Sequence, residues 1–265
     1  MKQRSNRVRL IALGAVAVLG LAACGSGDNA TDDTASEATE ETVAEEVVTG
    51  VGNDCTAGKT LAEGKLTIAT GNPAYEPWVV GDAPESKEGF EAAVAYGVAE
   101  EMGFSDENVV WVRTGFDEAI QPGAKNFDFN LQQFSITEER KANVTFSDPY
   151  YSTNQALVGF ADSPAAKFTK ASEMKDLKFG AQAGTTSLDF ITKVIQPNTE
   201  PFVYDDNAAA KAALEAKQVD AIVLDLPTAF YVSAVEIEGS KVIGQFPLSD
   251  QVAADNFGMV FDLNN

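Results

Sequence analysis

The sequence predicts an α/β fold with largely parallel sheets. Short apolar segments alternate with helical segments from residue 65 to residue 261, as in chains built from strand–helix–strand units. Several of these strands are followed by loops that carry polar and aromatic side chains, and open α/β sheets bind ligands at such strand ends. No short internal repeat is present, so a solenoid is excluded.

The first half of the chain contains the clearest elements. Residues 65–70 are predicted to form a strand, and the Gly- and Pro-rich residues 71–78 a loop. Residues 90–102 are predicted to form an amphipathic helix that stops at Gly103, with Phe90, Ala93, Val94, Gly97 and Val98 on its apolar face. A strand at 109–112, a helix at 116–120 and a strand at 127–132 follow.

The second half continues the alternation in shorter pieces. The expected strands and helices cover residues 155–160, 178–182, 188–195, 202–204, 207–217, 219–224, 228–235, 241–246 and 257–261.

Composition excludes several classes of function. The chain of 265 residues has no histidine, which rules out Ser-His-Asp and Cys-His nucleophiles and histidine-based zinc or haem sites. Its net charge is −21 and the predicted folded part has no basic cluster, so nucleic acid is not an expected partner. No metal or other cofactor is expected.

The N-terminus has the pattern of a targeting segment. Residues 1–23 combine four basic residues with an apolar run that is too short to span a bilayer comfortably. The run ends Leu21-Ala22-Ala23-Cys24-Gly25, which resembles a bacterial lipoprotein signal and implies acylation of Cys24. The alternative is an ordinary cleaved signal in which Cys24 occurs by chance.

Residues 24–58 are predicted to be a disordered acidic tether. From residue 25 to residue 58 there are nine Asp or Glu residues and no Lys or Arg, among Thr, Ala, Ser and Gly. Such a segment buries too little apolar surface to offset its ordering entropy. It would serve as a leash between a membrane and a folded domain.

Arg140 is the most informative single residue. It follows Thr137, a suitable N-cap, and Glu138 and Glu139, yet a cation in a first helical turn opposes the helix dipole. Beside hydroxyls and free backbone N–H groups, an arginine fork suits a carboxylate ligand. The alternative is a solvated arginine paired with Glu138 or Glu139.

Four other loops carry groups suited to an amino acid, and each has a structural alternative. Tyr75, Trp78 and Phe116 are flat rings that also suit a core. The turn around Thr185 and Thr186 could be an unoccupied helix cap, and Asp225 could cap the helix that opens near Pro227. Together they supply partners for a carboxylate, an ammonium group and a side chain.

Five motifs between residues 65 and 261 resemble the polar amino-acid family of ABC-transporter substrate-binding proteins. They are Gly89-Phe90-Glu91, the segment 135–140, Phe146-Ser147-Asp148-Pro149-Tyr150-Tyr151, the segment 182–186 and the segment 219–225. The resemblance implies two α/β lobes of the type II periplasmic-binding-protein fold, which close on a ligand in the cleft between them. The expected ranges are 59–158 for the first lobe, 159–248 for the second, and 249–265 for a return to the first.

The resemblance also implies roles for particular residues. Tyr75 and Phe116 would enclose the ligand side chain, with Trp78 and Gln133 nearby. Ser135, Thr137 and Arg140 would hold the carboxylate, and Thr185 and Thr186 would complete that site. Asp225 would accept hydrogen bonds from the α-ammonium group.

The function implied is capture of a free amino acid outside the cytoplasm and its delivery to an ABC permease by a monomeric, lipid-anchored receptor. Alternatives on the same fold are a small-carboxylate dehydratase and a ligand-sensing subunit without transport. A dehydratase needs a carboxyl group with a tuned pKa in the pocket, and Glu76 is the only loose candidate.

Two further expectations concern the ligand and the chain ends. Asn72, Glu76, Gln133 and Gln182 near the side-chain pocket favour a neutral polar ligand such as glutamine or cystine, followed by arginine or lysine. Family members usually continue with a C-terminal helix, so the resemblance implies a truncated chain, with Cys55 paired in the missing segment.

Overall fold

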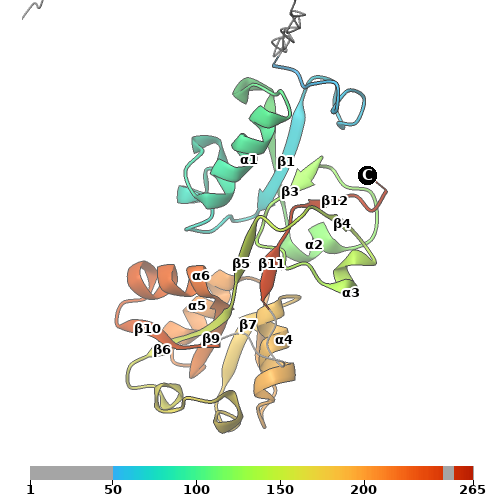
Figure 1. Cartoon of the computed structure of the whole chain (residues 1–265). Coiled ribbons are helices and arrows are strands. Elements are labelled where there is room, and N and C mark those ends of the chain that lie inside the picture. The colour runs from blue at the N-terminus through green and yellow to red at the C-terminus, as the bar shows by residue number, and fades with distance from the viewer. Residues whose placement is uncertain (1–49, 247–253, 265) are drawn as a thin grey trace, which may run out of the picture. The chain divides into compact units, whose positions relative to one another are not determined.

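The computed structural model describes residues 50–246 and 254–264 (Figure 1). The predicted signal peptide, Cys24 and residues 25–49 of the predicted tether lie outside the described residues, as do 247–253 and 265. Two five-stranded sheets, one in each of two lobes, belong to the same compact unit of the chain. The predicted α/β class with two lobes is confirmed.

The first sheet has the strand order β2-β1-β3-β12-β4. Its strands are β1 (Leu66–Gly71), β2 (Val109–Thr114), β3 (Phe129–Asn130), β4 (Thr145–Phe146) and β12 (Val260–Phe261). Three helices accompany it, namely α1 (Phe90–Glu101), α2 (Phe116–Ile120) and α3 (Glu138–Lys141). Side chains alternate along β1, so Leu66 and Ile68 pack with α1 while Ala69 packs with α2.

The second sheet has the strand order β10-β6-β9-β7-β8. Its strands are β6 (Gln155–Phe160), β7 (Phe179–Gln182), β8 (Phe202–Tyr204), β9 (Ala221–Asp225) and β10 (Ser240–Gln245). The helices are α4 (Thr186–Asp189), continued by a π-helix (Phe190–Ile195), then α5 (Asn207–Glu215) and α6 (Leu226–Tyr231), continued by a π-helix (Val232–Glu236). α5 and α6 cover one face and α4 with its π-helix the other.

Two short strands connect the sheets. β5 (Tyr151–Thr153) leads from the first sheet into β6, and β11 (Asp255–Phe257) leads back toward β12. They pair antiparallel, with Tyr151 opposite Phe257, and run between the two sheets in Figure 1. Since all of β6 belongs to the second sheet, the predicted boundary at 158/159 falls inside a strand, and we propose to move the division to β5.

The prediction of largely parallel sheets is wrong. Among the described residues, β1 pairs parallel with β2 and β3, and β7 pairs parallel with β8 and β9. In the first sheet, β12 pairs antiparallel with both β3 and β4. In the second sheet, β6 pairs antiparallel with both β9 and β10. The reason is that the chain enters the second sheet and re-enters the first along the crossover strands.

Helix α1 is present as predicted, but the face that it buries differs from the predicted one. Ala92, Ala95 and Ala99 are buried together with Glu91, whereas Ala93 and Gly97 are exposed. The helix is apolar almost all the way round, so periodicity could not fix its rotation. The buried face is instead set by small alanines against the sheet and by hydrogen bonds to Glu91.

The predicted tether is too long at its C-terminal end. Gly52 and Asn53 donate backbone hydrogen bonds to Gly103 and Met102, at 3.0 and 3.1 Å. Thr56 is buried. Residues 50–58 therefore pack on the end of α1, because the positive φ values of Gly50 and Gly52 turn the chain back onto it. Cys55 is exposed and forms no disulfide within the described part of the chain.

Candidate functional site

A cavity of about 290 Å³ is lined by residues of both sheets at the carboxyl ends of β1, β7 and β9. Eight of the ten ligand-binding residues predicted from the sequence line it: Tyr75, Phe116, Gln133, Ser135, Arg140, Thr185, Thr186 and Asp225. These strand ends are where open α/β sheets hold ligands.

Arg140 enters the cavity from α3 and is only 7% exposed. Its guanidinium donates to the carbonyl oxygens of Ser135 at 2.7 Å and Gly184 at 2.9 Å, and lies 5.4 Å from the ring centroid of Phe116. It forms no ion pair within the described residues; Glu138 pairs with Lys141 instead. The solvated alternative is therefore excluded. Burial lowers the pKa of Arg140, and the negative charge of Asp255 is the largest effect in the opposite direction. Because a buried cation without an ion pair is costly, an anion bound beside Arg140 would stabilise the site.

Hydroxyl groups from both lobes meet beside Arg140. Thr137 is the N-cap of α3, as predicted, and accepts from the backbone N–H of Arg140. The Ser135 hydroxyl lies 3.1 Å from that of Thr186 and donates to Asp255 at 2.9 Å. Because one proton cannot serve both, Ser135 accepts from Thr186 or from a ligand.

The turn before α4 needs glycine at position 184. Gly184 has φ of +68°, and a Cβ there would overlap the carboxylate of Asp117 on α2. Thr185, the N-cap of α4, accepts from the backbone N–H of Leu188 at 3.2 Å. The turn is thus both a helix cap, as one alternative held, and part of the cavity wall.

Asp225 is likewise both a helix cap and a cavity residue. Its carboxylate accepts from the backbone N–H of Thr228 at 3.1 Å and lines the cavity. Burial raises the pKa of Asp225 to about 6 despite the hydrogen bonds from Thr228, and Asp255 raises it further. A buried carboxylate of this kind is an acceptor for a cationic group.

The two predicted rings have separate supports. Phe116 stacks on Phe134, with ring centroids 4.8 Å apart. Tyr75 lies beneath the ammonium of Lys211 from α5, 5.2 Å from the ring centroid, and its hydroxyl is buried without a partner in the described structure. Burial, and then the charge of Asp206, raise the pKa of Tyr75 to about 12.

Gln133 is held by a buried acid. Its φ is +51°, and its backbone N–H donates to Glu91 at 2.8 Å, while its side-chain amide and the Tyr150 hydroxyl also donate to Glu91. Burial raises the pKa of Glu91 to about 7 against these bonds. Glu91 therefore fixes the backbone at the point where Gln133 lines the cavity.

Three residues discussed from sequence do not line the cavity. Trp78 is 1% exposed and donates to Thr228, and Thr137 caps α3 behind Arg140. Glu76 accepts from the backbone N–H of Gly81 at 3.1 Å and from the Tyr231 hydroxyl. Trp78 and Glu76 are directed away by partners on α6 that sequence spacing does not reveal, whereas Thr137 is held by the cap that the sequence predicts.

Sequence reasoning missed several polar residues of the wall. Gln155, the first residue of β6, is buried in the wall and donates a hydrogen bond of 2.8 Å to Asp255, which is buried behind the wall at the start of β11. Asp205 and Asp206 line the cavity after β8. The position after a strand was an available signal for Asp205 and Asp206, whereas Asp255 follows no predicted element.

Comparison with known proteins agrees with this geometry. Residues 66–223 match the family of bacterial extracellular solute-binding proteins, family 3. The glutamine-binding protein of Geobacillus stearothermophilus is 32% identical over 225 residues, 82% of this chain and 78% of that protein. The arginine-binding periplasmic protein of Mannheimia haemolytica is 27% identical over 195 residues, 73% and 76% of the two chains.

A solved structure is similar across both lobes. An ancestral arginine-binding protein bound to glutamine superposes with a TM-score of 0.63 at 27% identity, covering 77% of this chain and 86% of that one.

Proposed function

Because the chain belongs to the bacterial extracellular solute-binding proteins of family 3, and is therefore a binding protein rather than an enzyme, we propose that its cavity captures a free polar L-amino acid. The observation that carries this proposal is the pairing of charges in one cavity. Arg140 from the first lobe and Asp225 from the second both line it, and neither forms an ion pair within the described residues.

These two charges match the main-chain groups of a zwitterion. The Arg140 fork, with the hydroxyls of Ser135 and Thr186 beside it, suits a carboxylate, and Asp225 suits an ammonium group. A ligand held by both would contact both lobes, which favours the closed arrangement through differential contacts.

The remaining residues of the cavity wall limit which ligand side chains are favoured. Asn72, Gln132, Gln133 and Gln182 offer amide donors and acceptors, and Arg140 is the only Lys or Arg in the wall. An acidic side chain would meet Asp205 and Asp206 without a second cation, so glutamate and aspartate are disfavoured. Neutral polar and basic side chains fit, which is consistent with relatives named for glutamine and for arginine.

A thermal-shift panel of single amino acids at one concentration tests the proposal. We expect glutamine, cystine, arginine or lysine to raise the melting temperature, and glutamate and aspartate to have the smallest effects. A panel in which no amino acid stabilises the protein, or only acidic ones do, would contradict it. Isothermal calorimetry on the best ligand then provides the reference affinity.

We further propose that the protein delivers its ligand to an ABC permease while anchored to the outer face of the membrane through Cys24. The lipoprotein-like sequence at residues 21–25 supports the anchor. Family membership supports the permease, as does one relative, named as a putative ABC transporter arginine-binding protein of Escherichia coli. In the described part of the chain, no helix has the length and apolarity needed to cross a bilayer.

A further inference from the structure

Trp78, in the loop after β1, donates a hydrogen bond from a buried side chain to the second lobe. Its indole is 1% exposed and packs edge-on against Phe90, Tyr151 and Phe257, with ring centroids 5.8, 5.3 and 5.6 Å away. These rings come from α1, β5 and β11, so the indole is oriented by both crossover strands. Its Nε1–H donates to the Thr228 hydroxyl on α6 at 2.8 Å.

The direction of the hydrogen bond between Trp78 and Thr228 is fixed by the chemistry of the two groups. An indole N–H is only a donor, so the Thr228 oxygen must accept. The single proton of that hydroxyl is then available to Asp225, whose two carboxylate oxygens lie 2.9 and 2.8 Å from the Thr228 oxygen. Thr228 is 5% exposed, so no bulk water competes for either position. The chain of donation therefore runs from Trp78 through Thr228 to Asp225.

This direction matters for a cationic ligand. Without the indole, the Thr228 hydroxyl could turn its proton away and accept a hydrogen bond from a protonated Asp225, and the carboxyl group would then be a poorer partner for an ammonium group. Donation from the indole occupies one of the two lone pairs of the Thr228 oxygen and leaves its own proton to point toward Asp225, which favours the ionised carboxylate as the acceptor.

We propose that Trp78 and Thr228 are positioning residues for ammonium recognition, which hold Asp225 as an acceptor through a hydrogen-bond chain that exists only while the two lobes are in contact. This inference rests on the proposed function. It adds that recognition of the ligand's ammonium group and closure of the lobes depend on the same hydroxyl group.

A purely structural explanation makes different predictions. In that case the Thr228 backbone N–H merely completes the Asp225 cap, at 3.1 Å, and Trp78 merely fills space among three rings. Losses caused by altering the two side chains would then be independent and would add.

The test is a double-mutant cycle read by calorimetry, with L-glutamine and L-arginine titrated separately. Trp78→Phe removes the indole donor, Thr228→Val removes the hydroxyl at nearly constant shape, and Thr228→Ser retains it. We expect the first two variants to weaken binding about tenfold each, and the double variant to be no weaker than about tenfold. Thr228→Ser should stay within about twofold of the wild-type chain.

The chain offers a matched control in its second tryptophan. Trp111, on β2, donates to the hydroxyl of Tyr96, on α1, at 3.2 Å, and neither residue lines the cavity. Trp111→Phe should therefore leave the affinity unchanged. In that background Trp78 is the only tryptophan, and its fluorescence should shift to shorter wavelength when Thr228→Val removes its acceptor.

Additive losses, an unaffected Trp78→Phe variant, or a Thr228→Ser variant as weak as Thr228→Val would each overturn the inference. Thermal unfolding of every variant identifies losses that come from misfolding. A wild-type chain that binds no amino acid would refute the proposed function, and the inference with it, whereas wild-type binding with an additive cycle refutes the inference alone.

Discussion

At the scale of single residues, the proposed carboxylate site depends on Arg140, which lines the cavity. Its guanidinium is already divided between the carbonyls of Ser135 and Gly184, one in each lobe, and still presents donors to the cavity. A lysine ammonium has one nitrogen and cannot make the same planar set of bonds.

Arg140→Lys should therefore weaken amino-acid binding by tenfold or more, while the melting temperature without ligand changes little. Calorimetry measures the affinity. Lys141→Ala is the matched control, because Lys141 is the exposed neighbour that pairs with Glu138, and it should bind like the wild-type chain. Equal affinities for Arg140→Lys and wild type would remove the carboxylate assignment.

Asp225 should make binding depend on pH. Its pKa is raised from 3.8 to about 6, and only the ionised form accepts from an ammonium group. Affinity should be constant above pH 7 and should fall as the pH drops through 6, by about tenfold at pH 5. Calorimetry between pH 5 and pH 8 measures this.

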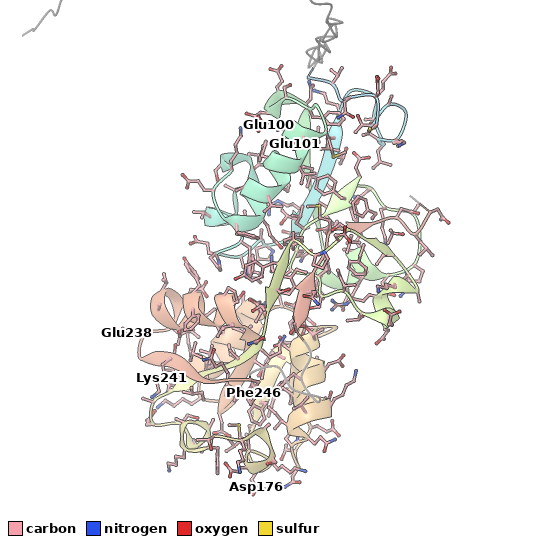
Figure 2. The ribbon with its side chains drawn as sticks, viewed as in Figure 1. Glu100, Glu101, Asp176, Glu238, Lys241 and Phe246 are labelled. Atoms are coloured by element: carbon pink, nitrogen blue, oxygen red, sulfur yellow. The ribbon has the colours of Figure 1, made fainter. Side chains whose placement is uncertain are left out.

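Asp225→Asn should bind weakly and lack this pH dependence. Glu238→Gln, which removes one exposed carboxylate at the outer edge of the same lobe (Figure 2), should retain both the affinity and its pH dependence. An unchanged profile in Asp225→Asn would reduce Asp225 to a helix cap.

Residue chemistry was predictable where the residue type itself was unusual for its position. A cation in the first turn of α3 and an acid at the end of β9 both indicated a ligand site, and both line the cavity. Trp78 could not be distinguished from Tyr75, because two aromatic residues three apart in a loop give no sign of which one faces inward. The partner that turns Trp78 away, Thr228, is 150 residues distant in sequence.

At the scale of elements, α1 is anchored by a buried acid. Glu91 is 1% exposed and its pKa is raised from 4.5 to about 7, mainly by burial. The folded state therefore retains a proton that the unfolded chain releases between pH 4.5 and 7. The free energy of unfolding should fall by roughly 3 kcal/mol as the pH rises through this range and then level off.

Glu91→Gln should remove that pH dependence, so its melting temperature should decrease less than that of the wild-type chain between pH 5 and pH 8. Glu100→Gln on the exposed side of the same helix is the matched control (Figure 2) and should follow the wild type. Identical pH profiles for Glu91→Gln and wild type would show that Glu91 titrates normally.

Element prediction succeeded where capping and periodicity agreed. α2 begins and ends as predicted, and Gly103, with φ of +81°, follows the end of α1. β4, β5 and β11 were missed because each combines one aromatic residue with polar residues over two or three positions, whereas β8, also three residues long, is entirely aromatic or apolar and was predicted. Their positions depend on pairing with segments about a hundred residues away, which no local pattern specifies.

At the scale of the whole molecule, attachment to the membrane is the part of the proposal that a single residue can test. Cys24→Ala removes the only thiol in the lipoprotein-like segment. The variant should lose incorporation of labelled fatty acid and move from the membrane fraction to the soluble fraction of the producing cells. Cys55→Ala is the matched control and should remain with the membrane, since Cys55 lies in the folded part.

The order of the strands also bears on how such receptors diversify. Every strand of the second sheet comes from one uninterrupted run, residues 155–245, whereas the first sheet takes strands from both sides of that run. The second lobe is thus an insertion in the chain of the first lobe, and β5 and β11 are the two connections between them. A recombination event with only two junctions could replace Asp225 and the Thr185–Thr186 turn together, and leave Arg140 and Tyr75 behind. The cavity residues contributed by the second lobe could therefore be inherited together, independently of those contributed by the first lobe.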